Sequence, residues 1–216
     1  MISDEVAEKW LAVHDEVQPL VLAHKFDEAC ALLTRRRDDA AAELQNELAA
    51  SLSSFLATCL TMTQRDSEAL IAAETAERLD PSSVEAKMSS ARVLLNFIGD
   101  PERARTKAEE LLGMVPAGNP LRYGTLALFG TALARSGHVQ AAVGVFHEMT
   151  SPEMLAGLRS AEYVGVFDLE LVNELVRAGV AKEECRRYLE VVRSVPNEWP
   201  HIQRQLDELL AAVTNV

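Results

Sequence analysis

The sequence predicts an all-α protein built from helix hairpins, and three observations support this prediction. Apolar residues recur three and four positions apart along most of the 216 residues, as in Leu52, Phe55, Leu56, Cys59 and Leu60. No alternating pattern long enough for a buried strand occurs. A short pattern of a turn residue followed by small apolar residues recurs at five places in the chain.

The recurring pattern defines five units. In the fourth unit, Gly137 is followed by Ala142 and Phe146, and in the second Gln64 is followed by Ala69 and Ala73 at the same offsets. Consecutive turn residues are 40, 35, 38 and 42 positions apart. The turn residues are His24, Gln64, Gly99, Gly137 and Gly179, and a leucine precedes each by four positions: Leu20, Leu60, Leu95, Leu133 and Leu175.

This layout resembles the tetratricopeptide repeat (TPR) family, in which units of about 34 residues form pairs of helices. The fourth unit carries the resemblance best, with Leu126, Phe129-Gly130, Leu133, Gly137, Ala142 and Phe146. The resemblance implies a right-handed α-α superhelix in a single domain, residues 1–216. The expected units are 5–37, 41–80, 82–116, 119–150 and 155–196, with a capping helix at 197–213.

Local signals place the ends of several of these helices. Pro19 lies inside the first helix and should kink or break it. Ser82 with Glu85 predicts a capping box. Asp100-Pro101 and Ser151-Pro152 each predict an N-cap followed by proline in the first turn. After Pro196, one apolar stripe predicts the final helix, from about 200 to 213, with one face buried and one solvated. The helix at 4–18 is expected to close the other end in the same way.

Small residues are predicted to let helices cross closely. Helix axes that approach to about 8 Å need alanine or glycine at the crossing point. Gly130 and Ala142 are placed to make such a crossing within one hairpin, and Ala29, Ala69 and Ala104 would do the same in others.

Composition excludes several classes of function. The formal net charge of −12 disfavours binding to nucleic-acid phosphates or anionic lipid. No apolar run approaches the roughly 18 residues of a membrane span, and the acidic start MISDEVAEKW lacks a signal core, so we expect a cytoplasmic protein. Cys30, Cys59 and Cys185 have no metal or disulfide spacing and are predicted to be small buried hydrophobes.

No motif points to catalysis. The five histidines form no HExxH or other metal-ligand spacing, and no phosphate-binding glycine loop or nucleophile elbow occurs. We therefore expect no enzyme activity, no metal and no cofactor. The charge run TRRRDDA, residues 34–40, is interpreted as a solvated turn at a helix boundary, with a partner contact as the alternative.

The resemblance implies a protein- or peptide-binding groove on the concave side, where the first helix of each unit lies. Arg135 and Arg177 occupy matching positions and could clamp a carboxylate, with ordinary surface ion pairs as the alternative. Val93 and Phe97 would form an apolar strip in this groove. Phe97 and Met62 would give apolar contacts or else belong to the core between units. The groove residues inferred from the TPR register are His14, Gln18, Thr58, Met62, Asn96, Phe97, Arg135, Asn173 and Arg177.

The sequence therefore favours an adaptor, scaffold or chaperone that binds a protein or peptide. The alternative is a regulatory sensor that takes a small ligand or signal peptide in the same groove. The lysine clamp of chaperone-binding TPR domains is absent, because its lysine positions hold His, Ser, Ala or Leu. An RNA-reading pentatricopeptide role conflicts with the negative charge, and a homo-oligomeric scaffold stays open.

Overall fold

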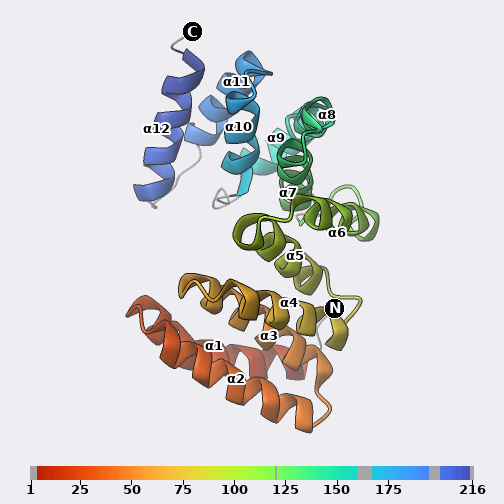
Figure 1. The fold of residues 1–216 in the computed structure, drawn as a ribbon, viewed down its shortest axis with the longest axis vertical. Coiled ribbons are helices and arrows are strands. Elements are labelled where there is room, and N and C mark those ends of the chain that lie inside the picture. Colours follow the sequence, from red (N-terminus) through yellow and green to blue (C-terminus); the bar gives the residue numbers. More distant parts are fainter. Residues whose placement is uncertain (1–3, 120, 160–166, 195–199, 215–216) are drawn as a thin grey trace. The chain divides into compact units, whose positions relative to one another are not determined.

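The computed structural model describes residues 4–119, 121–159, 167–194 and 200–214, and no strand occurs in these ranges (Figure 1). The all-α prediction is confirmed. The helices are α1 Asp4–Leu22, α2 Phe26–Ala42, α3 Asn46–Met62, α4 Asp66–Leu79, α5 Val84–Val93 with the π-helix η1 Leu94–Ile98, α6 Pro101–Met114, α7 Leu121–Arg135, α8 Val139–Met149, α9 Pro152–Arg159, α10 Phe167–Arg177, α11 Lys182–Ser194 and α12 Pro200–Thr214.

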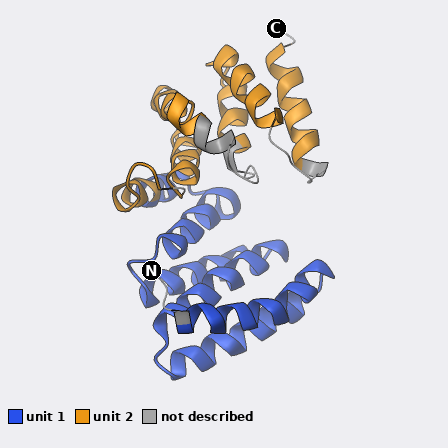
Figure 2. Cartoon of the chain, turned by 180° about the vertical axis from the view of Figure 1, so that it is seen from behind, with its two compact units in different colours: residues 1–107 blue, residues 108–216 orange. Residues whose placement is uncertain are grey.

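The chain divides into two compact units, Met1–Lys107 and Ala108–Val216, and the division falls inside α6 (Figure 2). Each unit has a buried apolar cluster of its own. We call them unit 1 and unit 2 and describe each by itself. A single domain over residues 1–216 stays a prediction.

Unit 1 is a stack of helix hairpins. The hairpins α1–α2 and α3–α4 are followed by α5 with η1, and α3 packs against α1, α2, α4 and α5. Ala29, Ala69 and Ala104, each five positions after a turn residue, have 0% exposed surface. Their lack of a large side chain lets the second helix of each hairpin pack closely.

The five turn residues of the repeat all have left-handed backbone conformation. Their φ angles are 57° for His24, 58° for Gln64, 72° for Gly99, 83° for Gly137 and 71° for Gly179. This conformation ends each first helix with a Schellman-type pair of hydrogen bonds. In four of the five sequence repeats, the residue after the turn residue donates its N–H to the carbonyl of the leucine four positions before the turn residue, at 2.8–3.1 Å. The periodic leucine is thus part of the helix ending as well as the core.

The third sequence repeat, with turn residue Gly99, departs from this pattern because η1 inserts one residue. Asp100 donates its N–H to the carbonyl of Leu94 at 2.9 Å, where the register predicts Leu95. Upstream of η1 the helix face is therefore shifted by one position. Val93, expected to line the groove, is only 3% exposed and lies in the core. Its neighbour Arg92 takes the equivalent place and is half-buried.

Two of the predicted helix signals need correction. Pro19 does not break α1, which runs on to Leu22; Ala23 donates its N–H to the Pro19 carbonyl at 3.1 Å. Pro19 lacks the N–H that would bond to the carbonyl of Asp15, so α1 loses one hydrogen bond while the helix continues past it. The N-cap of α5 is Ser83, whose hydroxyl accepts the N–H of Ala86 at 3.1 Å, and not Ser82.

Two other helix starts are confirmed. The Asp100 carboxylate accepts the N–H of Arg103 at 3.1 Å, and the Ser151 hydroxyl accepts that of Met154 at 3.4 Å. Each is followed by proline at the first helical position.

Unit 2 contains the hairpins α7–α8 and α10–α11, with α9 between them and α12 at the end. The short helix α9 accounts for part of the 42-residue separation of the last two turn residues. Ile202, Leu206, Leu209 and Val213 of α12 join the core cluster of the unit, so the predicted capping helix is confirmed.

Gly130 makes its tightest approach outside its own hairpin. A Cβ at this position would lie 2.6 Å from Leu171 Cδ2 on α10 and 3.2 Å from Val145 Cγ1 on α8. The sequence predicts a close crossing within one hairpin, but the closer approach to Gly130 is made by Leu171 of α10, in the next hairpin. Ala142 is fully buried, as expected.

The charge run at 34–40 lies within α2 and is not a turn. Arg36 donates from Nη2 to both carboxylate oxygens of Glu16 at 2.6 and 2.7 Å, so it joins α2 to α1. The three cysteines are buried and free, as predicted.

Candidate partner-binding surfaces

An exposed apolar row crosses the first helices of unit 1. Leu22, Met62 and Phe97 each lie two positions before a turn residue, at the end of α1, α3 and η1. Their exposed fractions are 73%, 59% and 44%. The helices α1 and α5 that carry or precede two of these positions both pack against α3, which carries the third. Met62 and Phe97 are thus surface residues rather than core. We call this set the apolar row.

Three polar groove candidates of unit 1 lie near the apolar row: Gln18 and Thr58 come one turn before Leu22 and Met62, and Asn96 directly precedes Phe97. Gln18 and Thr58 are exposed, and the Thr58 hydroxyl donates to the Ser54 carbonyl at 3.3 Å. Asn96 is half-buried and already has an interaction within the chain. Gln18 and Thr58 therefore offer hydrogen-bonding groups beside the apolar row, whereas Asn96 is partly engaged.

His14 is packed rather than free. Its ring stacks on Trp10 of α1, with centroids 4.9 Å apart, and on Phe55 of α3, with centroids 5.9 Å apart. Its Nδ1 lies 3.8 Å from the Asp15 carboxylate. This stacking fixes the α1–α3 contact, so the first contribution of His14 is structural.

The two groove arginines of unit 2 converge on one glutamate. Arg135 Nε donates to Glu174 Oε1 at 2.9 Å, and Arg177 Nη1 lies 3.7 Å from the same oxygen. Glu170 lies 4.0 Å from Arg135. The Glu174 side chain is only 15% exposed, whereas that of Arg177 is 69% exposed. A partner's carboxylate would have to share these guanidinium groups with Glu174.

Asn173 precedes Glu174 on α10 and is half-buried. Arg177 follows Asn173 by one turn of α10, and Arg135 of α7 donates to Glu174, the residue after Asn173. The sequence already contains the signal for this, because Glu174 and Arg177 are three positions apart on one helix. Arg135, from a different helix, could not be assigned to Glu174 by spacing.

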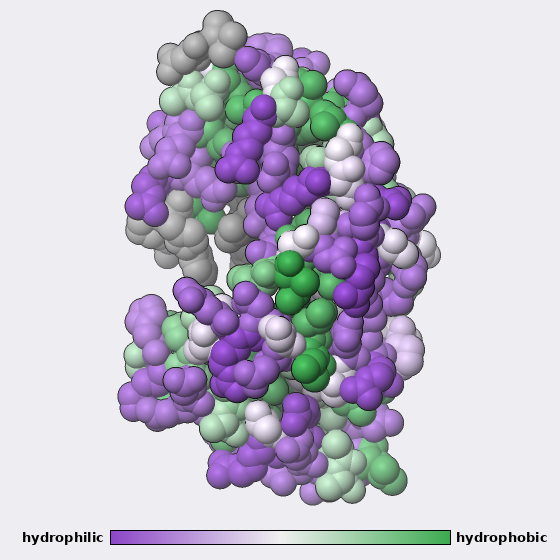
Figure 3. Space-filling view, in the orientation of Figure 1, coloured by the Kyte–Doolittle hydropathy of each residue, from purple (hydrophilic) through white to green (hydrophobic). Residues whose placement is uncertain are grey.

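Most of the visible surface is hydrophilic, with apolar side chains in separate small areas (Figure 3). No described helix is long and apolar enough to cross a membrane. Across the described ranges, no group of three or more His, Cys, Asp or Glu side chains is placed to hold a metal ion.

Comparison with known proteins supports the fold. The sequence matches no protein-family model, and no curated protein matches it either. Two solved structures are similar over nearly the whole chain. Both come from a Podospora anserina protein described as a kinesin light chain with nearly identical TPR-like repeats.

The first, a variant of that protein, superposes with a TM-score of 0.62 at 16% identity and covers 100% of both chains. The second has a TM-score of 0.60 at 17% identity and covers 96% of this chain and 98% of the other. The chain has a TPR-like fold. At 16–17% identity the likeness concerns the architecture alone.

Proposed function

We propose that the protein binds a segment of a partner protein on the first-helix face of unit 1, and so acts as an adaptor or scaffold. The observation that supports this most directly is the apolar row. Three large apolar side chains at one register position of consecutive first helices are exposed, and exposed apolar patches are typical of protein-interaction sites.

The chemistry of the face indicates the kind of segment. A row of apolar side chains flanked by Gln18 and Thr58 suits a partner helix or extended peptide with spaced apolar residues. Gln18 and Thr58 would accept or donate hydrogen bonds to polar groups of that segment. In unit 2, the well-exposed Arg177 is a separate candidate for an ion pair with an acidic residue of a partner.

The test is affinity capture from the native cell extract with the wild-type protein and two variants. Met62→Glu/Phe97→Glu places two carboxylates in the apolar row. Ile71→Glu is a control that adds one carboxylate outside the row, because Ile71 is 63% exposed on α4. We expect a captured partner to be lost with the row variant and retained with Ile71→Glu, at unchanged melting temperature.

Equal retention by both variants would show that the partner binds elsewhere, and equal loss would show that any added surface charge prevents capture. Either outcome contradicts the proposed surface. Arg177→Gln, run in parallel, should weaken capture only modestly, because a single exposed ion pair contributes about 0–1 kcal/mol.

A further inference from the structure

The methionines of the chain differ widely in exposure. Five of the six lie in the described ranges. Met149 is 0% exposed and Met88 is 6% exposed, and Met154 is half-buried. Met62 is 59% exposed and Met114 is 36% exposed. An oxidant in solution therefore reaches the thioether of Met62 more readily than those of the other four.

The three thiols compete poorly for the same oxidant. Cys30, Cys59 and Cys185 are 4%, 2% and 0% exposed. Burial also raises the pKa of each of these thiols, so little of the reactive thiolate is present near neutral pH. Accessible sulfur in the described part of the chain is thus concentrated at Met62 and Met114.

Met62 is the central member of the apolar row. It is the last residue of α3, and α3 packs against α1, which carries Leu22, and against α5, which leads into η1 and Phe97. Met114 is the last residue of α6, and no residue of the row lies on that helix. Met62 is therefore the exposed thioether that a partner bound on the row would contact.

Oxidation of this thioether would change the chemistry of the row. The sulfur lone pair attacks one oxygen of a hydroperoxide and forms the S–O bond while the O–O bond breaks. The proton of the attacked oxygen passes to the leaving oxygen, which departs as water or an alcohol, so sulfur is oxidised and the peroxide is reduced. The sulfoxide is a polar hydrogen-bond acceptor, and covering it with an apolar partner surface would deprive it of water.

We propose that Met62 is an oxidation site at which a hydroperoxide releases the partner from the apolar row. This inference rests on the proposed partner binding and adds its regulation. A thiol-dependent reductase reverses the change: two thiols become a disulfide, and the sulfoxide oxygen leaves as water. Partner binding is therefore coupled to the peroxide level and is recovered on reduction.

The first experiment treats the full chain with dilute hydrogen peroxide at neutral pH and follows every methionine by peptide mass mapping. We expect Met62 to gain one oxygen before Met114, and Met88 and Met149 to stay unmodified while circular dichroism shows a folded chain. Oxidation of Met114 ahead of Met62, or of the buried cysteines ahead of both, would overturn the assignment of the site.

The second experiment measures partner contact in living cells, with a benzophenone amino acid at Phe97 as the photo-crosslinking probe. A short peroxide pulse should lower the crosslinked product about tenfold, because the sulfoxide of Met62 loses its water in the contact. Met62→Leu keeps an apolar side chain that cannot form a sulfoxide, so its crosslinking should not change with peroxide. Met62→Gln, with a polar acceptor of similar length, should lower crosslinking without peroxide.

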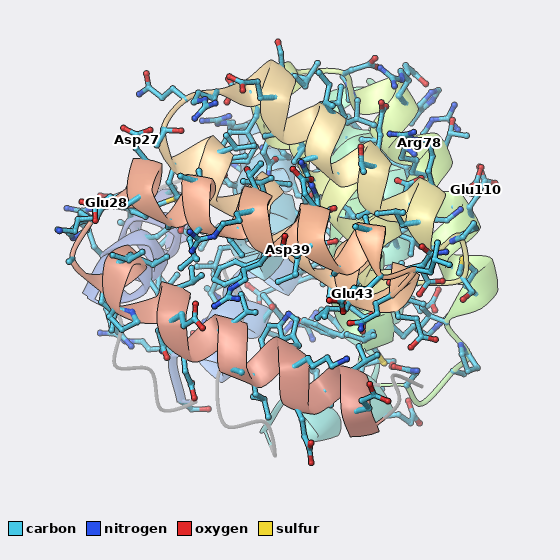
Figure 4. All side chains as sticks on the ribbon, turned by 90° about the horizontal axis from the view of Figure 1, so that it is seen from below. Asp27, Glu28, Asp39, Glu43, Arg78 and Glu110 are labelled. Atoms are coloured by element: carbon cyan, nitrogen blue, oxygen red, sulfur yellow. The ribbon has the colours of Figure 1, made fainter. Side chains whose placement is uncertain are left out.

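A relocated methionine is the matched control. Met62→Leu/Asp39→Met keeps the number of methionines and moves the exposed thioether to the last turns of α2, beside Glu43 (Figure 4). No residue of the apolar row lies on α2. Peroxide should oxidise the relocated thioether and leave crosslinking from Phe97 unchanged.

The outcomes separate this inference from the proposed function. Crosslinking that survives complete oxidation of Met62, or that falls equally in Met62→Leu, would overturn the oxidation switch and leave partner binding intact. No crosslinked product from untreated cells would instead contradict partner binding on the row, and the switch with it.

Discussion

The same register position has opposite character in the two units. Two residues before the turn, unit 1 has Leu22, Met62 and Phe97, which are exposed and apolar. Unit 2 has Arg135 and Arg177, which converge on the half-buried Glu174. The repeat determines which positions reach the surface, whereas the polarity and charge of the side chains at those positions differ between unit 1 and unit 2. Partner binding is therefore expected to differ between the units although their hairpins are alike.

The largest expected effect tests what the units share. Ala69 in unit 1 and Ala142 in unit 2 lie five positions after their turns, both with 0% exposed surface. Ala69→Leu and Ala142→Leu should each lower the free energy of unfolding by about 1–3 kcal/mol through overpacking. Chemical denaturation measures this. Ala141→Leu, at an exposed neighbouring position, should have little effect. A large difference between the destabilisation by Ala69→Leu and that by Ala142→Leu would contradict the structural equivalence of these two positions.

The turns offer a sharper contrast. Gln64 has φ 58° in unit 1, where unit 2 has Gly137 at 83°. A left-handed conformation costs a residue with a side chain about 1 kcal/mol, so Gly137→Ala should destabilise by about that amount. The converse change Gln64→Gly removes this conformational cost and should stabilise. The gain should be no more than about 0.5 kcal/mol, because glycine loses more backbone entropy on folding. Thermal melts would show the opposite signs, and shifts in the same direction would contradict this account.

The ion pairs of unit 2 should contribute less. Glu174→Gln removes the carboxylate shared by Arg135 and Arg177 and should cost about 0.5–1 kcal/mol. The loss should shrink in high salt, because the partner arginines are near the surface. Arg177→Gln should cost less, since that side chain is mostly exposed. Denaturation at two salt concentrations checks both. An effect of Glu174→Gln that does not depend on salt would count against an electrostatic origin.

The thiols should behave alike in the two units. Burial raises the pKa of Cys59 in unit 1 and of Cys185 in unit 2 to about 12. The unfolded chain ionises first as pH rises above about 9, so the native state should lose stability from that pH upward. At pH 8, both thiols should react with a thiol reagent only as fast as the chain opens. Rapid labelling of either cysteine in the native protein would be inconsistent with its burial.

The sequence predicts the hairpins well because their signals are local and periodic. The turn residues, the buried alanines and the final capping helix all follow from spacing. The extra residue of η1 was not predictable, since it depends on how the end of α5 packs and no residue marks a π-helix. The shift moved Val93 from a predicted groove position to the core.

The candidate site was predictable only in part. Periodicity indicates that Met62 and Phe97 belong to one row, but their exposure depends on which neighbours cover them. Similarly, the approach of Leu171 to Gly130 and the contact of Arg135 with Glu174 join residues from separate helices. Contacts of this kind arise from packing between hairpins, and spacing within one helix carries no information about them.

The most direct test of the partner-binding face is site-specific photo-crosslinking in living cells. A benzophenone amino acid would replace Met62, Phe97 or, as the control position, Ile71. We expect crosslinked products with a second protein from Met62 and Phe97 and none from Ile71. Products from Ile71 alone, or none from the row, would contradict it.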